Sequence, residues 1–336
     1  MLQHCGDSGS PNRILLQPLA ELKNQIGANR GQTFRFMRRH FTHALLILSL
    51  GAGAIAAAPA TQVSGGGAPT PAQLQSFIAR AIDNQHRDDQ LLEEYDRIEH
   101  VQTRKTSDSP VAEDQYSRIV PIGTGSFHIT VTPNAQPADP AQYRQQLAMI
   151  QNSLQLALQP DAREKQDLAK YQKRQEERAE LVSDIAKAFR FTWLGRETRN
   201  GKLLAKVRLD PVPSFVPPSR IGEVLPHVQA TIWFDESASQ VVHIEAQITS
   251  DVYIGGGVLG KIYRGGQFWL EQAEIAPGVW EPVAYDYEFA GRKFVFGFEV
   301  HEKTEVSQYR HLGPLPQKLT FIRNELNTAS GGHSGD

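Results

Sequence analysis

The chain has 336 residues, of which 40% are hydrophobic and 21% are charged, and it contains 27 glycines, 20 prolines and one cysteine. This is the composition of a globular protein with one large domain or two small ones, and it excludes collagen, coiled-coil rods, fully disordered chains and disulfide scaffolds. The net charge of −2 predicts neither a nucleic acid nor an anionic membrane surface as a partner.

A leader for export is predicted at residues 37–60. Arg38 and Arg39 precede an apolar run that ends in small residues with an A-x-A site. This order is typical of a secretory signal peptide, here with cleavage after Ala60 and a periplasmic or secreted mature chain. The alternative is a retained membrane anchor, but about half of the run is Ala, Gly, Ser and Thr, which is weak for a span. We therefore expect no stable membrane span after cleavage.

Residues 1–36 lie outside this pattern, because a signal peptide normally begins close to its basic residues. Met37 directly precedes the two arginines, so we interpret residues 1–36 as a non-native N-terminal extension. The stretch from Cys5 to Pro11 resembles the sequence around the nucleophile of chymotrypsin-like proteases. Those enzymes need a His and an Asp upstream of that Ser, and almost no chain precedes it here.

Three helix starts are visible in the sequence. Thr70-Pro-Ala-Gln73 has the order of an N-cap, an N1 proline and a capping-box glutamine, and apolar residues at helical spacing follow, which predicts a helix over 71–90. Asp139 and Asp161 are the predicted N-caps of two further helices.

The residues from 161 to 180 alternate six acids with six bases around sparse apolar positions. One interpretation is a charged docking helix, but the balanced charge favours a solvated helix with i,i+4 pairs. The domain organisation that we predict is a linker at 61–69, one domain at 70–326 with a helical insertion at 139–188, and a disordered tail at 327–336.

After Phe189 the sequence changes to short strands with turn signals, which predicts an antiparallel meander. Asn200-Gly201 lies between two apolar runs and is the strongest hairpin signal. Two apolar stripes with period two are predicted to line strand faces, either as a filled core or as the wall of an open cavity. The candidate ligand-binding residues on these stripes are Val242, Ile244, Ile248, Phe294, Phe296 and Phe298.

No motif in the mature chain predicts catalysis, a cofactor or a metal site. Gly255–Lys261 fits half of a P-loop, but Ile262 stands where the magnesium-binding Ser or Thr belongs, so we predict a glycine-rich bend. His243 with Glu245 and His301 with Glu299 are two-residue pairs of the kind that alternating surface residues produce by chance, and zinc needs more ligands. We expect a non-enzymatic protein.

Several stretches together resemble a known family: Ala230-Thr-Ile-Trp-Phe-Asp235, Val242-His-Ile-Glu245, Gly278-Val-Trp-Glu-Pro282 and Arg292-Lys-Phe294. With the signal peptide and the first helix, they are similar to the lipoprotein-carrier superfamily of LolA, LolB and RseB. The similarity is greater to uncharacterised exported acidobacterial proteins with a charged helical insertion and a hairpin like Gly195–Gly201. This resemblance implies an α+β fold with a curved, half-open antiparallel sheet, an incomplete barrel, whose apolar interior takes acyl chains in the carriers.

The first functional hypothesis is therefore a periplasmic protein that binds an apolar ligand, a lipid or a lipoprotein acyl chain, without catalysis. The second is a protein-interaction or envelope-sensing module on the same fold, and the third is an unrecognised hydrolase. A deep apolar groove favours the first, an exposed apolar patch over a filled core favours the second, and a polar cleft with perturbed acids favours the third.

Overall fold

The structure is a computed structural model that describes residues 67–219 and 221–331. The predicted extension at 1–36, the predicted signal peptide at 37–60 and most of the predicted linker at 61–69 lie outside the described residues. Within the described ranges, no helix is long and apolar enough to cross a membrane.

Three helices begin where the sequence predicts them: α2 (Pro71–Leu91), α3 (Pro140–Leu158) and α4 (Ala162–Ala188). The Thr70 side chain accepts a hydrogen bond from the Gln73 backbone N–H, and the Gln73 side chain accepts one from the Thr70 N–H. Asp139 and Asp161 cap α3 and α4 through their carboxylates, which accept hydrogen bonds from backbone N–H groups of the first turn. Each cap provides an acceptor for N–H groups that have no partner inside the helix, so local sequence determines these helix starts.

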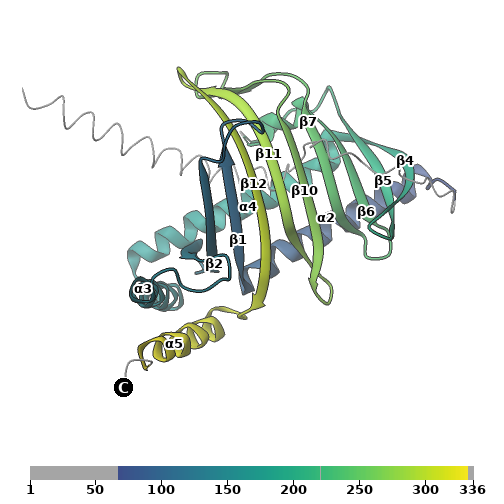
Figure 1. Cartoon of the computed structure of the whole chain (residues 1–336). Coiled ribbons are helices and arrows are strands. Elements are labelled where there is room, and N and C mark those ends of the chain that lie inside the picture. The colour runs from purple at the N-terminus through teal and green to yellow at the C-terminus, as the bar shows by residue number, and fades with distance from the viewer. Residues whose placement is uncertain (1–66, 220, 332–336) are drawn as a thin grey trace, which may run out of the picture. The chain divides into compact units, whose positions relative to one another are not determined.

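The described residues form one antiparallel sheet of twelve strands with the order β3-β2-β1-β12-β11-β10-β7-β6-β5-β4, to which β8 and β9 are added through β9 and β11 (Figure 1). The strands are β1 (Tyr95–Arg104), β2 (Glu113–Pro121), β3 (Ser126–Val131), β4 (Phe189–Arg199), β5 (Lys202–Pro211), β6 (Val228–Asp235), β7 (Gln240–Ile248), β8 (Val252–Ile254), β9 (Gly260–Ile262), β10 (Gln267–Ala276), β11 (Val279–Lys293) and β12 (Phe296–His311). The sheet is curved and does not close, because β3 and β4 stand at its two ends. The predicted α+β class with a curved, open antiparallel sheet is confirmed.

The β4–β5 hairpin forms at the predicted dipeptide. Asn200 and Gly201 have φ values of 50° and 77°, the left-handed conformations that a tight two-residue turn requires. Arg199 pairs with Lys202 on either side of the turn. This turn is therefore determined by its own two residues.

The β11–β12 hairpin differs from the prediction. Lys293 pairs with Phe296, so Phe294 and Val295 form the turn between the strands, and Phe294 has a φ of 52°. The prediction that Phe294 shares one strand face with Phe296 and Phe298 is wrong. No glycine, asparagine or proline marks this turn, so the alternating aromatic pattern continues through it without a visible break.

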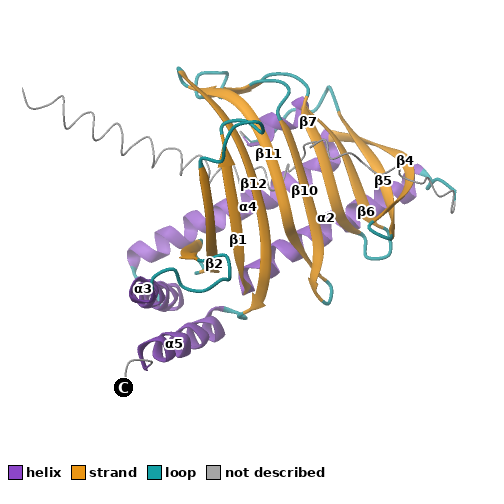
Figure 2. Ribbon diagram, in the orientation of Figure 1, coloured by secondary structure: helices purple, strands orange, loops and turns teal. Residues whose placement is uncertain are grey.

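Helices α2 and α4 lie against one face of the sheet, which we call the inner face (Figure 2). The Phe77 ring of α2 meets the Phe234 ring of β6 edge-on, with 5.1 Å between the centroids. The two helices join through Arg178 of α4 and Asp89 of α2, whose charged atoms are 2.8 Å apart. The inner face is therefore covered over part of its area by a pair of helices in contact with each other.

Helix α4 is solvated over most of its length, as predicted, but not at its C-terminal end. Its buried residues are confined to the last two turns: Leu181, Val182, Asp184 and Ala188. In the charged half, Tyr171 donates a hydrogen bond to Glu93, which follows α2. The charged half is thus anchored to the neighbouring chain at a few points rather than being wholly solvated.

Two short 3₁₀ helices complete the elements near α2 and α4. They are η1 (Leu92–Glu94), directly after α2, and η2 (Ile221–His227), directly before β6.

Helix α5 (Leu315–Gly331) forms where no helix was predicted, although Leu315, Leu319, Ile322 and Leu326 have helical spacing. It packs with α3 against β1–β3 on the outer face, which is the side of the sheet opposite α2 and α4. The buried residues of this contact are Ile98, Val120, Ile129, Leu147, Ile150 and Ile322.

The predicted disordered tail also differs from the structure. Residues 327–331 form the end of α5, and residues 332–336 lie outside the described part. Leu326 and Ala329 pack against the cluster between α3 and α5, and the Ala329 carbonyl accepts a hydrogen bond of 3.3 Å from Arg144. These contacts with α3, which lies far away in sequence, extend a helix that its polar last residues did not predict.

A buried ion cluster attaches α3 and α5 to the sheet. The Arg118 guanidinium of β2 donates to Asp96 at 2.7 Å, to Glu325 of α5 at 2.7 Å and to the Tyr143 hydroxyl of α3 at 2.6 Å. Arg310 of β12 also donates to Asp96 at 3.1 Å. Because each buried charge has charged or hydroxyl partners, the desolvation cost of the cluster is offset within it.

Candidate ligand-binding site

Four aromatic side chains form a row on the inner face, which we call the aromatic row. The Phe268 centroid lies 6.5 Å from both the Tyr285 and the Tyr287 centroids, and the Tyr287 centroid lies 5.4 Å from that of Phe289. The register places them together, because Phe268 pairs with Tyr287 and alternate residues of β11 point to one face. All four are at most 5% exposed.

The apolar surface continues from the aromatic row across β7 and β6. Ala246 pairs with Phe268, and Ile244 pairs with both Leu270 and Ile232. The small side chain of Ala246 leaves room beside the Phe268 ring, and both residues are buried. The inner face therefore presents one continuous apolar band over four neighbouring strands.

Two glycines allow the rings to lie close to the backbone. A Cβ added at Gly266 would lie 2.5 Å from the Phe289 ring, and one added at Gly291 would lie 2.8 Å from the Phe298 ring. Real Cβ atoms do not approach that closely, so only glycine fits beneath these rings. The apolar band thus depends on backbone positions that lack side chains.

Three of the six candidate residues from the sequence lie on the inner face. Ile248 is 4% exposed, and Ile244 and Phe298 are half-buried. Val242 is the unpaired residue of a bulge between the pairs of Trp233 and Phe234, so it is out of register with the others.

The other two candidates lie outside the covered part of the sheet. Phe294, in the β11–β12 turn, is 48% exposed, and Phe296, at the first position of β12, is 66% exposed. The predicted stripe of Phe294, Phe296 and Phe298 is therefore not continuous in the structure. Phe298 lies on the inner face, whereas Phe294 and Phe296 are in contact with solvent.

The inner face becomes polar toward the other end of β11. Glu281 is 1% exposed, and its Oε1 has no hydrogen-bond partner among the described residues. Burial raises the pKa of Glu281 well above its ordinary value, and nearby Asp89 acts in the same direction. Arg97, which donates to Glu99 at 2.9 Å, opposes that shift. Burial therefore favours the neutral form of the Glu281 carboxyl in the folded chain.

Hydrogen bonds attach α2 to the ends of the strands. The Asn84 amide donates to the carbonyl oxygens of Ala238 and Ser239, at 3.1 and 2.9 Å, in the β6–β7 turn. The Gln240 amide donates to Asp88 at 2.7 Å, and Arg87 donates to the Gly278 carbonyl at 3.2 Å in the β10–β11 turn. Hydrogen bonds of this kind exchange with water at modest net cost, so α2 can leave the sheet more easily than a wholly apolar helix.

The two inner carboxyls with raised pKa values are enclosed. Burial raises the pKa of Asp88, as it does that of Glu281, but both carboxyls are 1% exposed and no substrate can reach them in this arrangement. His243 lies 3.2 Å from Glu245, as its spacing predicts, whereas His301 pairs with Asp286 at 2.9 Å rather than with Glu299. Among the described residues, no group of three His, Cys, Asp or Glu side chains is placed to hold a metal ion.

The glycine-rich segment that fits half of a P-loop is a turn between two short strands. β8 ends at Ile254 and β9 begins at Gly260, and Gly255, Gly256 and Gly257 all have positive φ between them. A phosphate-binding loop lies between a strand and a helix, and no helix follows here. The predicted bend describes this segment better than a nucleotide site.

The sequence did not identify the aromatic row, although part of its signal is present. Tyr285, Tyr287 and Phe289 alternate with Asp286 and Glu288, the pattern of a half-buried strand. Phe268 lies seventeen or more residues earlier and joins the row only through strand pairing. The aromatic row is therefore visible only once the register between β10 and β11 is known.

No family model matches the chain, and no curated protein matches it significantly. A putative outer membrane lipoprotein-sorting protein domain from Vibrio parahaemolyticus is similar to it in structure, with a TM-score of 0.30, 10% identity, and coverage of 74% of this chain and 99% of that chain. A DUF1329 family protein from Desulfovibrio piger is similar with a TM-score of 0.25, 8% identity, and coverage of 70% and 92%.

Proposed function

We propose that this chain binds an apolar ligand, a lipid or a lipoprotein acyl chain, between the inner face and α2, without catalysis. The observation that carries the proposal is the apolar band of the inner face, which includes the aromatic row, together with α2, a helix that packs on this face at Phe234 and is hydrogen-bonded to the ends of the strands. Movement of α2 away from the sheet exposes this band to a ligand that replaces the contacts of the helix.

The energetics of such an exchange are favourable for a long chain. Each methylene removed from water contributes about 0.8 kcal/mol, so an acyl chain can offset the loss of the apolar contacts of α2. Those contacts come from one short stripe, which consists of Leu74, Phe77, Ile78 and Ala81. The polar end of the inner face, near Arg97 and Glu281, is suited to the head of an amphipathic ligand rather than to its chain.

A second function is favoured by a different observation. Phe294 and Phe296 are exposed while the aromatic row is buried, which is the combination expected of an interaction module with a filled core. The hydrolase hypothesis has no comparable support, because the perturbed carboxyls are enclosed.

We also propose that the mature chain is periplasmic or secreted, with cleavage after Ala60, on the order of basic residues, apolar run and A-x-A site in the sequence. N-terminal sequencing of protein recovered from a bacterial periplasm tests this. A mature chain that retains Phe41–Leu50 would contradict it.

The binding proposal is tested with a fluorescent long-chain fatty acid titrated into the protein. Ile244→Trp adds bulk on the inner face, and Gln247→Trp adds the same bulk at an exposed position of the same strand. We expect saturable binding by the wild type, weakened about tenfold by Ile244→Trp and unchanged by Gln247→Trp, since overpacking of one side chain costs 1 kcal/mol or more. Absence of saturable binding by the folded wild type would overturn the proposal.

A further inference from the structure

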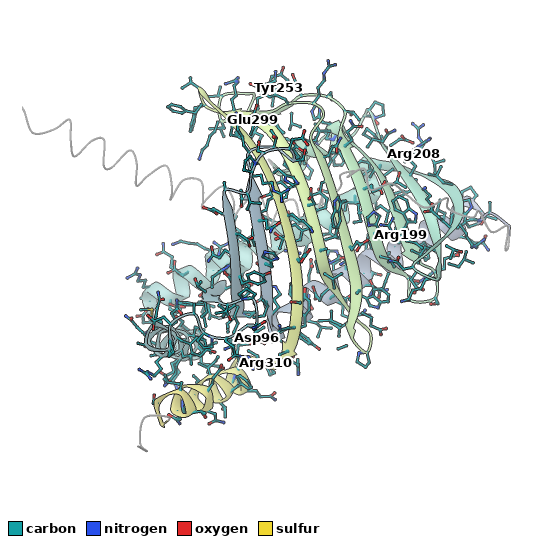
Figure 3. All side chains as sticks on the ribbon, in the orientation of Figure 1. Asp96, Arg199, Arg208, Tyr253, Glu299 and Arg310 are labelled. Atoms are coloured by element: carbon teal, nitrogen blue, oxygen red, sulfur yellow. The ribbon has the colours of Figure 1, made fainter. Side chains whose placement is uncertain are left out.

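The exposed aromatic residues of the described chain all lie at one end of the sheet, which we call the tip. It consists of the β8–β9 turn with its flanking residues (251–264) and the β11–β12 turn with its flanking residues (291–299). The exposed apolar residues of the first segment are Tyr253, Val258, Leu259 and Tyr263, and those of the second are Phe294, Val295 and Phe296. Figure 3 shows Tyr253 and Glu299 at this end and Asp96 and Arg310 at the opposite end.

The tip is one surface rather than two separate loops. β9 pairs with β11 through Gly260 and Lys293, and β8 pairs with β9. The Phe294 N–H donates to the Leu259 carbonyl at 3.2 Å, and the Arg292 guanidinium donates to the carbonyls of Phe294 and Gly257, at 2.6 and 3.2 Å. The backbone of both turns is therefore ordered before anything binds to them.

The exposure of these residues is large. Val295 is 84% exposed, Val258 is 72% exposed and Phe296 is 66% exposed. Elsewhere in residues 67–219 and 221–331, the large apolar side chains that are exposed are aliphatic and belong to α3, β4, β5 and two loops: Val111, Met149, Leu158, Leu194, Leu203 and Val216. Single exposed apolar residues are ordinary, whereas a contiguous group that includes every exposed aromatic side chain marks a contact surface.

The charges of the tip identify the kind of partner. Its two segments carry four basic residues, Lys261, Arg264, Arg292 and Lys293, and two acidic ones. Each acid is paired with a lysine: Asp251 with Lys261 at 2.7 Å, and Glu299 with Lys105 at 3.0 Å. The tip is thus locally positive although the whole chain has a net charge of −2. The net charge of the chain did not predict an anionic partner, because it does not show this local excess of basic residues.

The order of residue types matches a lipid–water interface. Phe294, Val295 and Phe296 are at the turn, while the Lys261 ammonium lies 4.9 and 5.3 Å from the rings of Tyr253 and Tyr263. Tyrosine and lysine favour the headgroup level of a bilayer, and phenylalanine and valine favour the acyl region below it. Basic residues near the surface add attraction to anionic headgroups.

We infer that the tip docks on the surface of a bilayer that contains anionic phospholipid, with Phe294, Val295 and Phe296 inserted among the acyl chains and Lys293 and Arg264 on the headgroups. The tip adjoins the apolar part of the inner face, because the Phe298 ring packs over Gly291 between the two. The inference does not depend on ligand binding at the inner face, since it stands on surface residues alone.

The experiment uses the full chain with a polarity-sensitive fluorophore on a single cysteine, introduced as Val258→Cys in a Cys5→Ser background. The matched control carries the label at Met149→Cys, an exposed apolar position on α3. Vesicles are phosphatidylcholine, alone or with about 30% phosphatidylglycerol. We expect a blue shift of the Val258 label with the anionic vesicles and none of the Met149 label. Because the label reports its own surroundings, the apolar run at 41–58 does not imitate this result.

Two pairs of variants test the separate contributions. Phe296→Ser should weaken vesicle binding about tenfold, since burial of a phenylalanine contributes at least that much, and Val216→Ser should leave it unchanged. Lys293→Gln should weaken binding to the anionic vesicles about fivefold, and Lys173→Gln on α4 should not. Circular dichroism checks that each variant is folded, which exposed positions allow.

Three results would overturn the inference: no shift of the Val258 label on anionic vesicles, vesicle binding that Phe296→Ser does not weaken, or a dimer in light scattering that Phe296→Ser dissociates. The last result would identify a second copy of the chain as the partner of the tip.

Discussion

Two parts of the same hairpin have opposite environments. Tyr285, Tyr287 and Phe289 on β11 are at most 5% exposed, whereas Phe294 in the turn and Phe296 on β12 are 48% and 66% exposed. Both parts have aromatic residues at alternate positions, so the pattern does not separate them. The difference lies in what packs against each part. Phe268 of the neighbouring β10 lies beside the first part. The second part lies beyond the end of the pairing with β10, where the short strand β9 is instead the neighbour of β11.

The largest effect that tests this comparison is expected at the centre of the aromatic row. Phe268 is 1% exposed, between the rings of Tyr285 and Tyr287. Phe268→Ala removes the ring from a close-packed interior and should lower the free energy of unfolding by about 3–5 kcal/mol. Urea denaturation monitored by circular dichroism measures this. A loss below about 1 kcal/mol would mean that the interior is open rather than packed.

A pH titration of stability tests the polar end of the inner face. The raised pKa of Glu281 means that the folded chain holds a proton which the unfolded chain releases above its ordinary value of 4.5. The free energy of unfolding should therefore fall as the pH rises from 4.5 through the raised pKa of the folded state. Burial also raises the pKa of Asp88, which contributes a slope of the same sign.

The matched variant for this measurement is Glu281→Gln, which keeps the shape and remains neutral. We expect its free energy of unfolding to decline less steeply with pH than that of the wild type, because one of the two groups no longer ionises. Identical slopes in the two proteins would show that folding does not raise the pKa of Glu281, and the expected effect of its burial would be wrong.

A smaller effect separates the two kinds of charge on α4. The side chain of Arg178 is 19% exposed and donates two hydrogen bonds to Asp89, whereas the side chain of Lys173 is 75% exposed. Arg178→Ala should lower stability by about 1 kcal/mol, and Lys173→Ala should change it by no more than about 0.5 kcal/mol. Equal losses in thermal unfolding would contradict this difference between the anchored and solvated charges.

The smallest effect is expected at the exposed end of the hairpin. Phe296→Ala removes a ring that is 66% exposed, so the free energy of unfolding should change by no more than about 0.5 kcal/mol. The losses in free energy of unfolding of Phe296→Ala and Phe268→Ala, measured under the same conditions, directly compare the exposed part of the hairpin with the buried part. A loss of several kcal/mol would show that the Phe296 ring is covered in solution.

Much of the fold follows from short-range signals in the sequence. The starts of α2, α3 and α4 depend on capping residues within three positions, and the β4–β5 turn depends on Asn200-Gly201. These features appear where they were predicted because their energetics involve adjacent residues only. Helix α5 was missed although its apolar residues have helical spacing, and only its last turn depends on packing against α3.

The candidate site was only half predictable for the same reason. Ile244, Ile248 and Phe298 reach the inner face because alternation along a strand holds locally. A bulge displaces Val242 from the register, and a turn without glycine or asparagine places Phe294 and Phe296 at the tip. Neither the bulge nor this turn has a recognisable signal in the amino-acid sequence.

The sequence by itself determined where the helices begin, which segments become strands and where one hairpin turns, since hydrogen bonds and steric preferences within a few residues decide those features. The tertiary structure alone decided which aromatic residues are enclosed and which are exposed. That outcome depends on the pairing of β10 with β11 and on the packing of α2 and α4 against the inner face. An apolar side chain gains free energy from any surface that removes it from water. Which aromatic residues become buried is therefore decided by the distant segments that supply such a surface, and not by the residues themselves.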